Sequence, residues 1–106
     1  MLQQAIRAVI KRDPTTVHRL RKADRVVDIS YQLLQQSALA MLRATPERSE
    51  RVTYLLWIAH NLERIADRSV NIAERAAFIA TGTVPTAPEY LVAASDLSSA
   101  DVVGAP

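Results

Sequence analysis

Apolar residues recur every three or four positions along most of this chain, which is the spacing that places them on one face of an α-helix. Proline sites divide this pattern into three stretches. Asp13-Pro14 and Thr45-Pro46 each place a capping residue before a proline, which is typical of a helix start. The sequence therefore predicts a short first helix before Asp13, a second helix from near Pro14, and a third from Thr45.

Gly82, followed by two prolines, is typical of a helix end, so we expect the third helix to run through Thr81 and the second to about Arg43. Each long helix then has about 30 residues, and so short a turn forces the two to lie nearly antiparallel. The shorter first helix is expected to cover their shared groove. These features predict an all-α fold, with an antiparallel three-helix bundle over residues 1–82 and a disordered tail over 83–106.

Four acidic residues occupy mirrored positions about the predicted turn. Asp24 and Asp28 are one helical turn apart on the second helix, as are Glu63 and Asp67 on the third. Counting outward from the turn at Thr45-Pro46, Asp24 is as distant as Asp67, and Asp28 is as distant as Glu63. Residues equally far from the turn of an antiparallel hairpin lie at the same height, so the four carboxylates are expected to meet.

The direction of these side chains around each helix supports the same expectation. At about 100° per residue, Asp24 and Asp28 fall on the side of Leu20, Val27 and Tyr31, which should be buried. On the third helix, polar residues form a stripe beside an apolar band. The stripe contains His60, Glu63, Asp67, Asn71 and Glu74, and the band contains Val52, Leu55, Ala59, Leu62, Ala66, Val70, Ala73 and Ala77.

Carboxylates that meet at a helix seam repel one another, so their pKa values rise or they need a cation. Hard metal ions favour carboxylate oxygens, iron also binds them, and helical bundles build metal sites from inward-facing carboxylates. The alternative is that the acids pair with nearby arginines, namely Arg21, Arg25, Arg64 and Arg68. His60 is one turn before Glu63, but this His-x-x-Glu order is the reverse of the Glu-x-x-His of ferritin-like di-iron sites.

Composition excludes several other functions. The 106 residues include 13 basic and 11 acidic residues, for a net charge of +2, and no cysteine. The absence of cysteine excludes thiolate chemistry and fits a reducing compartment, so we expect a cytoplasmic protein. The basic residues are interleaved with acids and lack aromatic platforms, which does not indicate nucleic-acid binding. No serine has a paired base and no glycine-rich phosphate loop is present, so we expect no enzymatic activity.

Two strings of the chain resemble the motifs of the PhoU family of phosphate-uptake regulators. The third helix contains Ile58-Ala-His-Asn-Leu-Glu-Arg-Ile-Ala-Asp-Arg-Ser-Val-Asn-Ile-Ala-Glu74 and then Phe78-Ile-Ala-Thr-Gly82, which together resemble the signature helix of that family. Upstream, Lys22-Ala-Asp-Arg-Val-Val-Asp28 resembles its other acidic motif. PhoU-like proteins have two tandem three-helix bundles, whereas this chain has one, which is more similar to the C-terminal half.

The resemblance implies a metal-binding regulator that represses phosphate-starvation signalling when phosphate is plentiful. The implied partners are the ATPase of a phosphate ABC transporter and a sensor histidine kinase, so that membrane association occurs only through partners. Three interpretations of the single bundle stay open: a truncated gene product, an excised domain, or a homo-oligomer, most simply a homodimer, that restores the second bundle by association. The implied site is a multinuclear metal centre of iron, or alternatively zinc, manganese or magnesium, with Asp24, Asp28, Glu63 and Asp67 as ligands and Asn71 and Glu74 as secondary ligands.

Two other hypotheses remain open from the residues. One is a carboxylate-bridged metalloenzyme, which requires an open coordination position and turnover. The other is a metal-free helical interaction or oligomerisation module, in which the acids pair with arginines. The metalloenzyme requires a bound metal and the interaction module does not, so metal dependence separates these two hypotheses.

Overall fold

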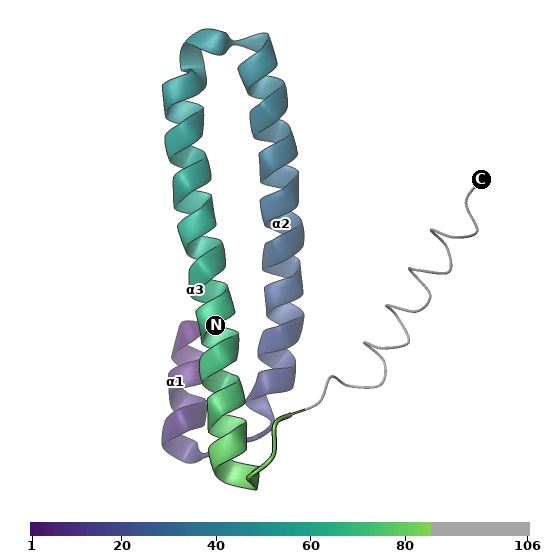
Figure 1. Ribbon diagram of the computed structural model, residues 1–106, viewed down its shortest axis with the longest axis vertical. Helices are drawn as coiled ribbons and strands as arrows, with labels where there is room; N and C mark the ends of the chain where they lie inside the picture. Colours follow the sequence, from purple (N-terminus) through teal and green to yellow (C-terminus); the bar gives the residue numbers. More distant parts are fainter. Residues whose placement is uncertain (86–106) are drawn as a thin grey trace, which may run out of the picture.

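The computed structural model describes residues 1–85, which form three α-helices and one short 3₁₀ helix (Figure 1). In chain order these are α1 (Leu2–Lys11), α2 (Thr16–Ala44), the 3₁₀ helix η1 (Pro46–Arg48) and α3 (Ser49–Thr81). The prediction of an all-α three-helix bundle is confirmed. From residue 86 onward, the tail expected over 83–106 lies outside the described residues. None of the three helices combines the length and the apolarity that a membrane span requires.

The turn between α1 and α2 is held by one carboxylate. Asp13 accepts hydrogen bonds from the backbone N–H of Thr15 at 2.8 Å, from the Thr15 hydroxyl at 2.7 Å, and from the Thr16 hydroxyl at 2.9 Å. These bonds keep Pro14 and Thr15 in the turn, so α2 begins at Thr16, two residues later than the sequence predicts. Asp13 thus organises the start of the helix from outside it, in the manner of an Asx turn.

The third helix begins after η1 and ends at a glycine. Thr45 precedes Pro46 as expected, but its hydroxyl donates to the Met41 carbonyl at 3.1 Å instead of capping the helix that follows. The chain therefore makes a 3₁₀ turn first, and α3 follows it. At the other end, Gly82 has a φ of 73°, in the left-handed region that favours glycine, and its N–H donates to the Phe78 carbonyl at 2.7 Å.

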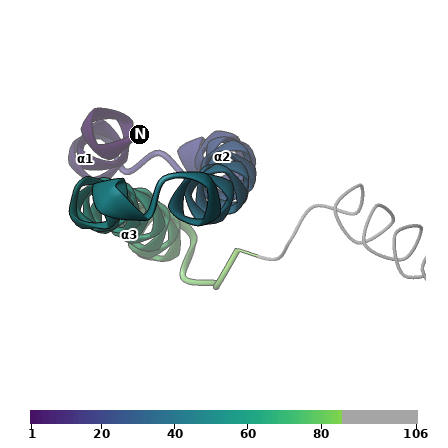
Figure 2. The ribbon, with the colours of Figure 1, turned by 90° about the horizontal axis from the view of Figure 1, so that it is seen from above.

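The long helices α2 and α3 form an antiparallel hairpin, and α1 lies beside the half of α3 that is farther from the hairpin turn (Figures 1 and 2). Small side chains dominate this packing, which lets the helices approach closely. The core cluster consists of Ala5, Val17, Leu20, Val70, Ala73 and Ala77. Seen from above in Figure 2, α3 packs extensively against both α1 and α2, whereas the contact between α1 and α2 is small.

The position of α1 differs from the expected one. The sequence suggests a first helix that covers the groove between the long helices, whereas α1 packs mainly against α3 and begins about halfway along the hairpin (Figure 1). The half of the hairpin nearer the turn is therefore left as two helices. Leu55 and Leu62 of the predicted apolar band lie in that half and remain 56% and 59% exposed.

Candidate metal centre

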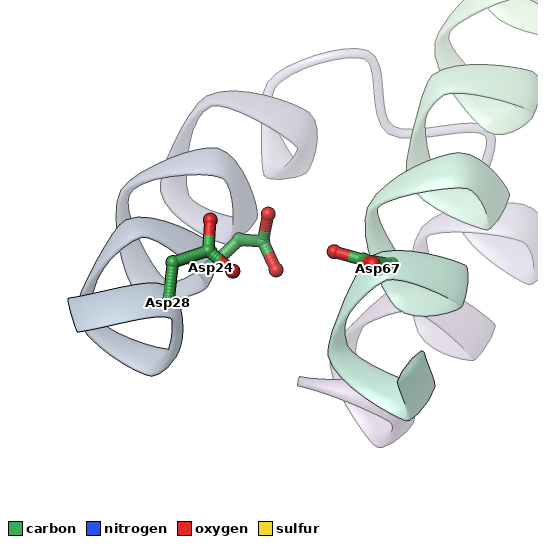
Figure 3. A group of neighbouring side chains, drawn as sticks. All are labelled: Asp24, Asp28 and Asp67. Carbon is green, nitrogen blue, oxygen red and sulfur yellow. The ribbon is translucent and has the colours of Figure 1, made fainter. Parts of the chain in front are cut away.

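The hairpin brings three of the predicted acidic ligands together between α2 and α3 (Figure 3). Asp24 and Asp28 project from consecutive turns of α2, and Asp67 points toward them from α3. One carboxylate oxygen of each residue lies within 4.8 Å of those of the other two. All three side chains are partly buried. We call this cluster the acidic triad.

Glu63 adjoins the acidic triad. The Glu63 carboxylate is close enough to Asp67 and Asp28 to feel their charges, although it is not among the oxygens that lie within 4.8 Å of one another. Asn71 is exposed, one turn beyond Asp67 on α3. His60 is also exposed, with its ring centroid 6.2 Å from that of Tyr31. The geometry therefore concentrates the candidate site on the triad and Glu63.

Glu74, the remaining candidate, takes part in an ion pair that the sequence did not indicate. Arg21 Nη2 lies 3.0 Å from Glu74 Oε1 and also donates to the Pro85 carbonyl at 3.0 Å. Equal distance from the hairpin turn pairs Arg21 with Val70 of α3, and Glu74 lies one helical turn farther from the turn than Val70. The mirror rule therefore does not predict this pair. The long arginine side chain spans that difference. Arg21 lies one helical turn before Asp24, on the acidic side of α2, and this position is the feature of the sequence that could have predicted the ion pair.

The acidic triad is electrostatically unfavourable in the absence of a cation. Partial burial raises the pKa of Asp24 to about 6, and repulsion by Asp28, Asp67 and Glu63 adds to the rise, as does a hydrogen bond that protonated Asp24 shares with Asp67. Burial and then the charge of Asp67 also raise the pKa of Glu63. Holding these carboxylates together in their ionised form therefore costs free energy.

The residues present fit a cation with oxygen ligands. Asp24 Oδ1 is buried and has no hydrogen-bond partner, whereas buried polar atoms are ordinarily paired. Arg21 forms its 3.0 Å salt bridge with Glu74, which lies outside the triad. A set of carboxylates from two helices suits hard ions such as Mg²⁺ or Mn²⁺, as well as iron.

This molecule belongs to the class of helical bundles with an acidic seam, in which carboxylates from neighbouring helices face one another. Comparison with known families narrows the class. The PhoU domain family matches residues 1–76, and the chain belongs to this family. The resemblance found in the two acidic motifs is thereby confirmed.

The relatives are longer than this chain. A "Phosphate-specific transport system accessory protein PhoU homolog" of Rhizobium meliloti is 32% identical over 84 residues, which cover 79% of this chain and 35% of the relative. Proteins of the same name from Synechocystis sp. and Zymomonas mobilis are 34% and 35% identical over 82 residues, covering 77% of this chain and 36% and 35% of theirs. The chain thus spans about a third of the length of the curated relatives it matches. No solved structure matches it.

Removing the charge of Asp24 is expected to stabilise the metal-free protein at neutral pH. Asp24 binds its proton more tightly when folded, with a pKa of about 6, than at its ordinary pKa of 3.8, so the wild type loses stability as the pH rises from about 4 through 6. Asp24→Asn keeps the shape without the charge. In urea unfolding with chelator present, we expect it to exceed the wild type by on the order of 1 kcal/mol at pH 7.5, and by much less at pH 4.

The matched control is Glu47→Gln, which removes an exposed acid from η1 and should leave the pH dependence unchanged. The Thr15 and Thr16 hydrogen bonds lower the pKa of Asp13 to about 2, which adds stability that is lost as the pH falls from about 4 through 2. This contribution is common to all three proteins and cancels in the comparison. Equal stability of wild type and Asp24→Asn at pH 7.5 would show that the triad carries no electrostatic strain.

Proposed function

We propose that this chain is a regulatory domain of phosphate uptake that acts by binding other proteins rather than by catalysis. Its membership of the PhoU family and the name that its relatives share, phosphate-specific transport system accessory protein, support this proposal. The observation that carries it is the acidic triad, in which both acidic motifs of the sequence contribute to one cluster. The proposal therefore has two parts, a metal centre and a set of partners.

In the proposed metal centre, Asp24, Asp28 and Asp67 hold the ion or ions, with Glu63 beside them. Bound iron, or alternatively zinc, manganese or magnesium, supplies the positive charge that offsets carboxylate repulsion, either as one ion or as a multinuclear cluster. By sharing a cation, Asp28 and Asp67 would tie α2 to α3, so that metal binding stabilises the hairpin. Asn71 and Glu74 remain outside this ligand set.

The proposed partners are the ATPase of a phosphate ABC transporter and a sensor histidine kinase, through which the domain represses phosphate-starvation signalling when phosphate is plentiful. The proposed location is the cytoplasm, with membrane association only through these partners. Two aliphatic residues of α2, Ile29 and Leu33, are more than half exposed and do not line the groove between α2 and α3. They provide an apolar surface suited to docking, which supports action through protein contacts.

A homo-oligomer is part of the same proposal. The matched segment makes up only 35% of the Rhizobium meliloti relative, so that protein has additional chain outside the region of similarity. A second copy of this chain would supply a second bundle. The exposed apolar residues on the half of the hairpin near the turn are consistent with such an association.

Metal analysis tests the first part of the proposal. Protein purified without chelator or metal-affinity tag is expected to contain stoichiometric metal and to melt at a lower temperature after chelation. Asp28→Asn combined with Asp67→Asn should reduce the metal content at least about tenfold while retaining helical circular dichroism, because the variant removes one ligand charge from each helix. Glu47→Gln with Glu50→Gln removes the same charge from the exposed hairpin tip and should retain the metal.

Absence of metal from the wild type, even after incubation with iron, manganese or zinc, would contradict the metal centre and favour the metal-free interaction module. Metal content that is unchanged in the Asp28→Asn/Asp67→Asn variant would contradict the assigned ligands. Oxygen reactivity or hydrolytic turnover that is lost with the metal would instead favour the carboxylate-bridged metalloenzyme. The three hypotheses thus give different results on the same preparations.

Complementation tests the second part. In a bacterium that lacks its own PhoU homolog, expression of this chain is expected to restore repression of a phosphate-starvation reporter in phosphate-rich medium. The Asp28→Asn/Asp67→Asn variant should restore less repression at equal protein level, and Glu47→Gln/Glu50→Gln should match the wild type. Failure of the wild type to repress, together with failure to co-purify with the transporter ATPase or the kinase, would contradict the proposed partners.

A further inference from the structure

A second apolar stripe follows α3 on a different side from the acidic triad. It occupies the a and d positions of a heptad repeat, with isoleucine at every seventh residue. Its members are Leu55, Ile58, Leu62, Ile65, Ser69, Ile72, Ala76 and Ile79. At about 100° per residue, this heptad stripe is centred well away from Glu63 and Asp67. Such spacing forms a continuous seam that packs against another helix.

Within the structure, α1 already covers the half of the heptad stripe that is farther from the hairpin turn (Figures 1 and 2). Ser69 and Ala76 are buried there, at 0% and 1% exposure, and Ile72 packs against the core cluster. The α1 residues Ala5 and Ala8 are buried as well. Small residues on both helices permit this close packing, so Ser69, Ile72 and Ala76 have their helix partner, whereas Ile79 at the far end of the stripe is 60% exposed.

The other half of the heptad stripe continues beyond the start of α1, and no helix among residues 1–85 covers it. Leu55, Ile58, Leu62 and Ile65 are each 49–59% exposed. Leu62 and Ile65 line a groove of about 450 Å³ between α2 and α3, and Leu2 of α1 lines the same groove. The uncovered half therefore combines projecting side chains with a hollow that side chains from another helix can fill.

The exposed flank of α1 extends this surface. Leu2, Ile6, Val9 and Ile10 fall on one side of α1 and are 41–76% exposed. Leu2 and Ile65 meet at the same groove, so the two surfaces are continuous. Eight large aliphatic side chains that are 41–76% exposed amount to a patch comparable to the roughly 800 Å² per partner of a stable protein interface. Apolar patches of this size mark association surfaces.

We propose that the uncovered half of the heptad stripe, together with the exposed flank of α1, is the surface through which two copies of this chain associate. This inference deepens the proposed function and rests on its homo-oligomer, for which it names the interface. Across a two-fold axis, the α3 helices of the two copies would pack against each other near their hairpin turns. The two hairpins would then complete a four-helix arrangement in the region that α1 leaves open.

The pattern of the stripe favours a second copy over a different partner. Leucine and isoleucine alternate along its uncovered half, so two identical stripes present matching knobs and holes to each other. No a or d position from Leu55 to Ile79 is charged, and Arg51, seven residues before Ile58, marks the charged end of the seam near the hairpin turn.

The oligomeric state of the full chain tests this interface. In sedimentation velocity over about 1 to 100 µM, the wild type is expected to form a dimer. Ile58→Glu with Ile65→Glu should weaken association at least ~100-fold and leave a monomer, because it puts charges at the centre of the contact. The matched control is Ile29→Glu with Leu33→Glu on the outer side of α2, where Ile29 has the same 56% exposure as Ile58. This control should remain dimeric.

The single tryptophan provides a second readout. Trp57 is adjacent to Ile58, so its emission is expected to shift to shorter wavelength as the wild type and the control dimerise, and not in the Ile58→Glu/Ile65→Glu variant. Because the chain has no cysteine, a spin label at Ile65→Cys reports from that site alone. Two labels at Ile65→Cys should lie close together across the dimer, and labels at Ile29→Cys should not, even if the glutamate variant fails to fold.

Three results would overturn the interface: a monomeric wild type over the whole range, a dimer that survives in the Ile58→Glu/Ile65→Glu variant, or equal dissociation of the control. Metal content measured on the same proteins keeps this inference distinct from the proposed function. A monomeric Ile58→Glu/Ile65→Glu variant that retains its metal supports both. Metal loss in every protein, with dimerisation unaffected, would contradict the metal centre and leave the interface standing.

Discussion

Repulsion among carboxylates that the hairpin forces together is the constraint on which the rest of this structure depends. Asp24 and Asp67 meet because α2 and α3 are joined by a short turn and run antiparallel, not because the carboxylates attract each other. Asp24 Oδ1 is buried without a hydrogen-bond partner, so the hairpin leaves one carboxylate oxygen uncompensated. We expect a bound ligand to offset the free-energy cost of this repulsion, and carboxylates favour a cation as that ligand.

The helix α3 connects the two proposed activities of the molecule. One side of α3 supplies Asp67 to the acidic triad, and another side carries the heptad stripe, part of which α1 covers. A cation shared between α2 and α3 would fix the spacing of the hairpin, and the groove lined by Leu62 and Ile65 lies between the same two helices. Metal binding and association of two copies are thus proposed to act on one pair of helices, which offers a physical route from a bound ion to a docking surface.

The sequence predicted the helices and the position of each acidic residue along the hairpin axis. In an antiparallel hairpin, this position follows from the number of residues between the acid and the turn. Mirror positions about Thr45-Pro46 therefore identified the triad. Rotation and lateral packing were less predictable, because they depend on which side chains permit close approach. Buried alanines on α1 bring it against α3, so Leu55 remains exposed although its spacing is that of a core residue. Residue positions along the helices also do not account for the length of a side chain, so the ion pair between Arg21 and Glu74 was not predicted.

The central claim, that one metal centre is built from both long helices, is tested most directly by anomalous X-ray diffraction. Crystals of the wild-type chain equilibrated with Mn²⁺ would be measured near the manganese absorption edge. The account predicts an anomalous peak between α2 and α3, at bonding distance from carboxylate oxygens of Asp24, Asp28 and Asp67. Manganese bound only elsewhere, or these three carboxylates without a metal at a saturating Mn²⁺ concentration, would contradict it.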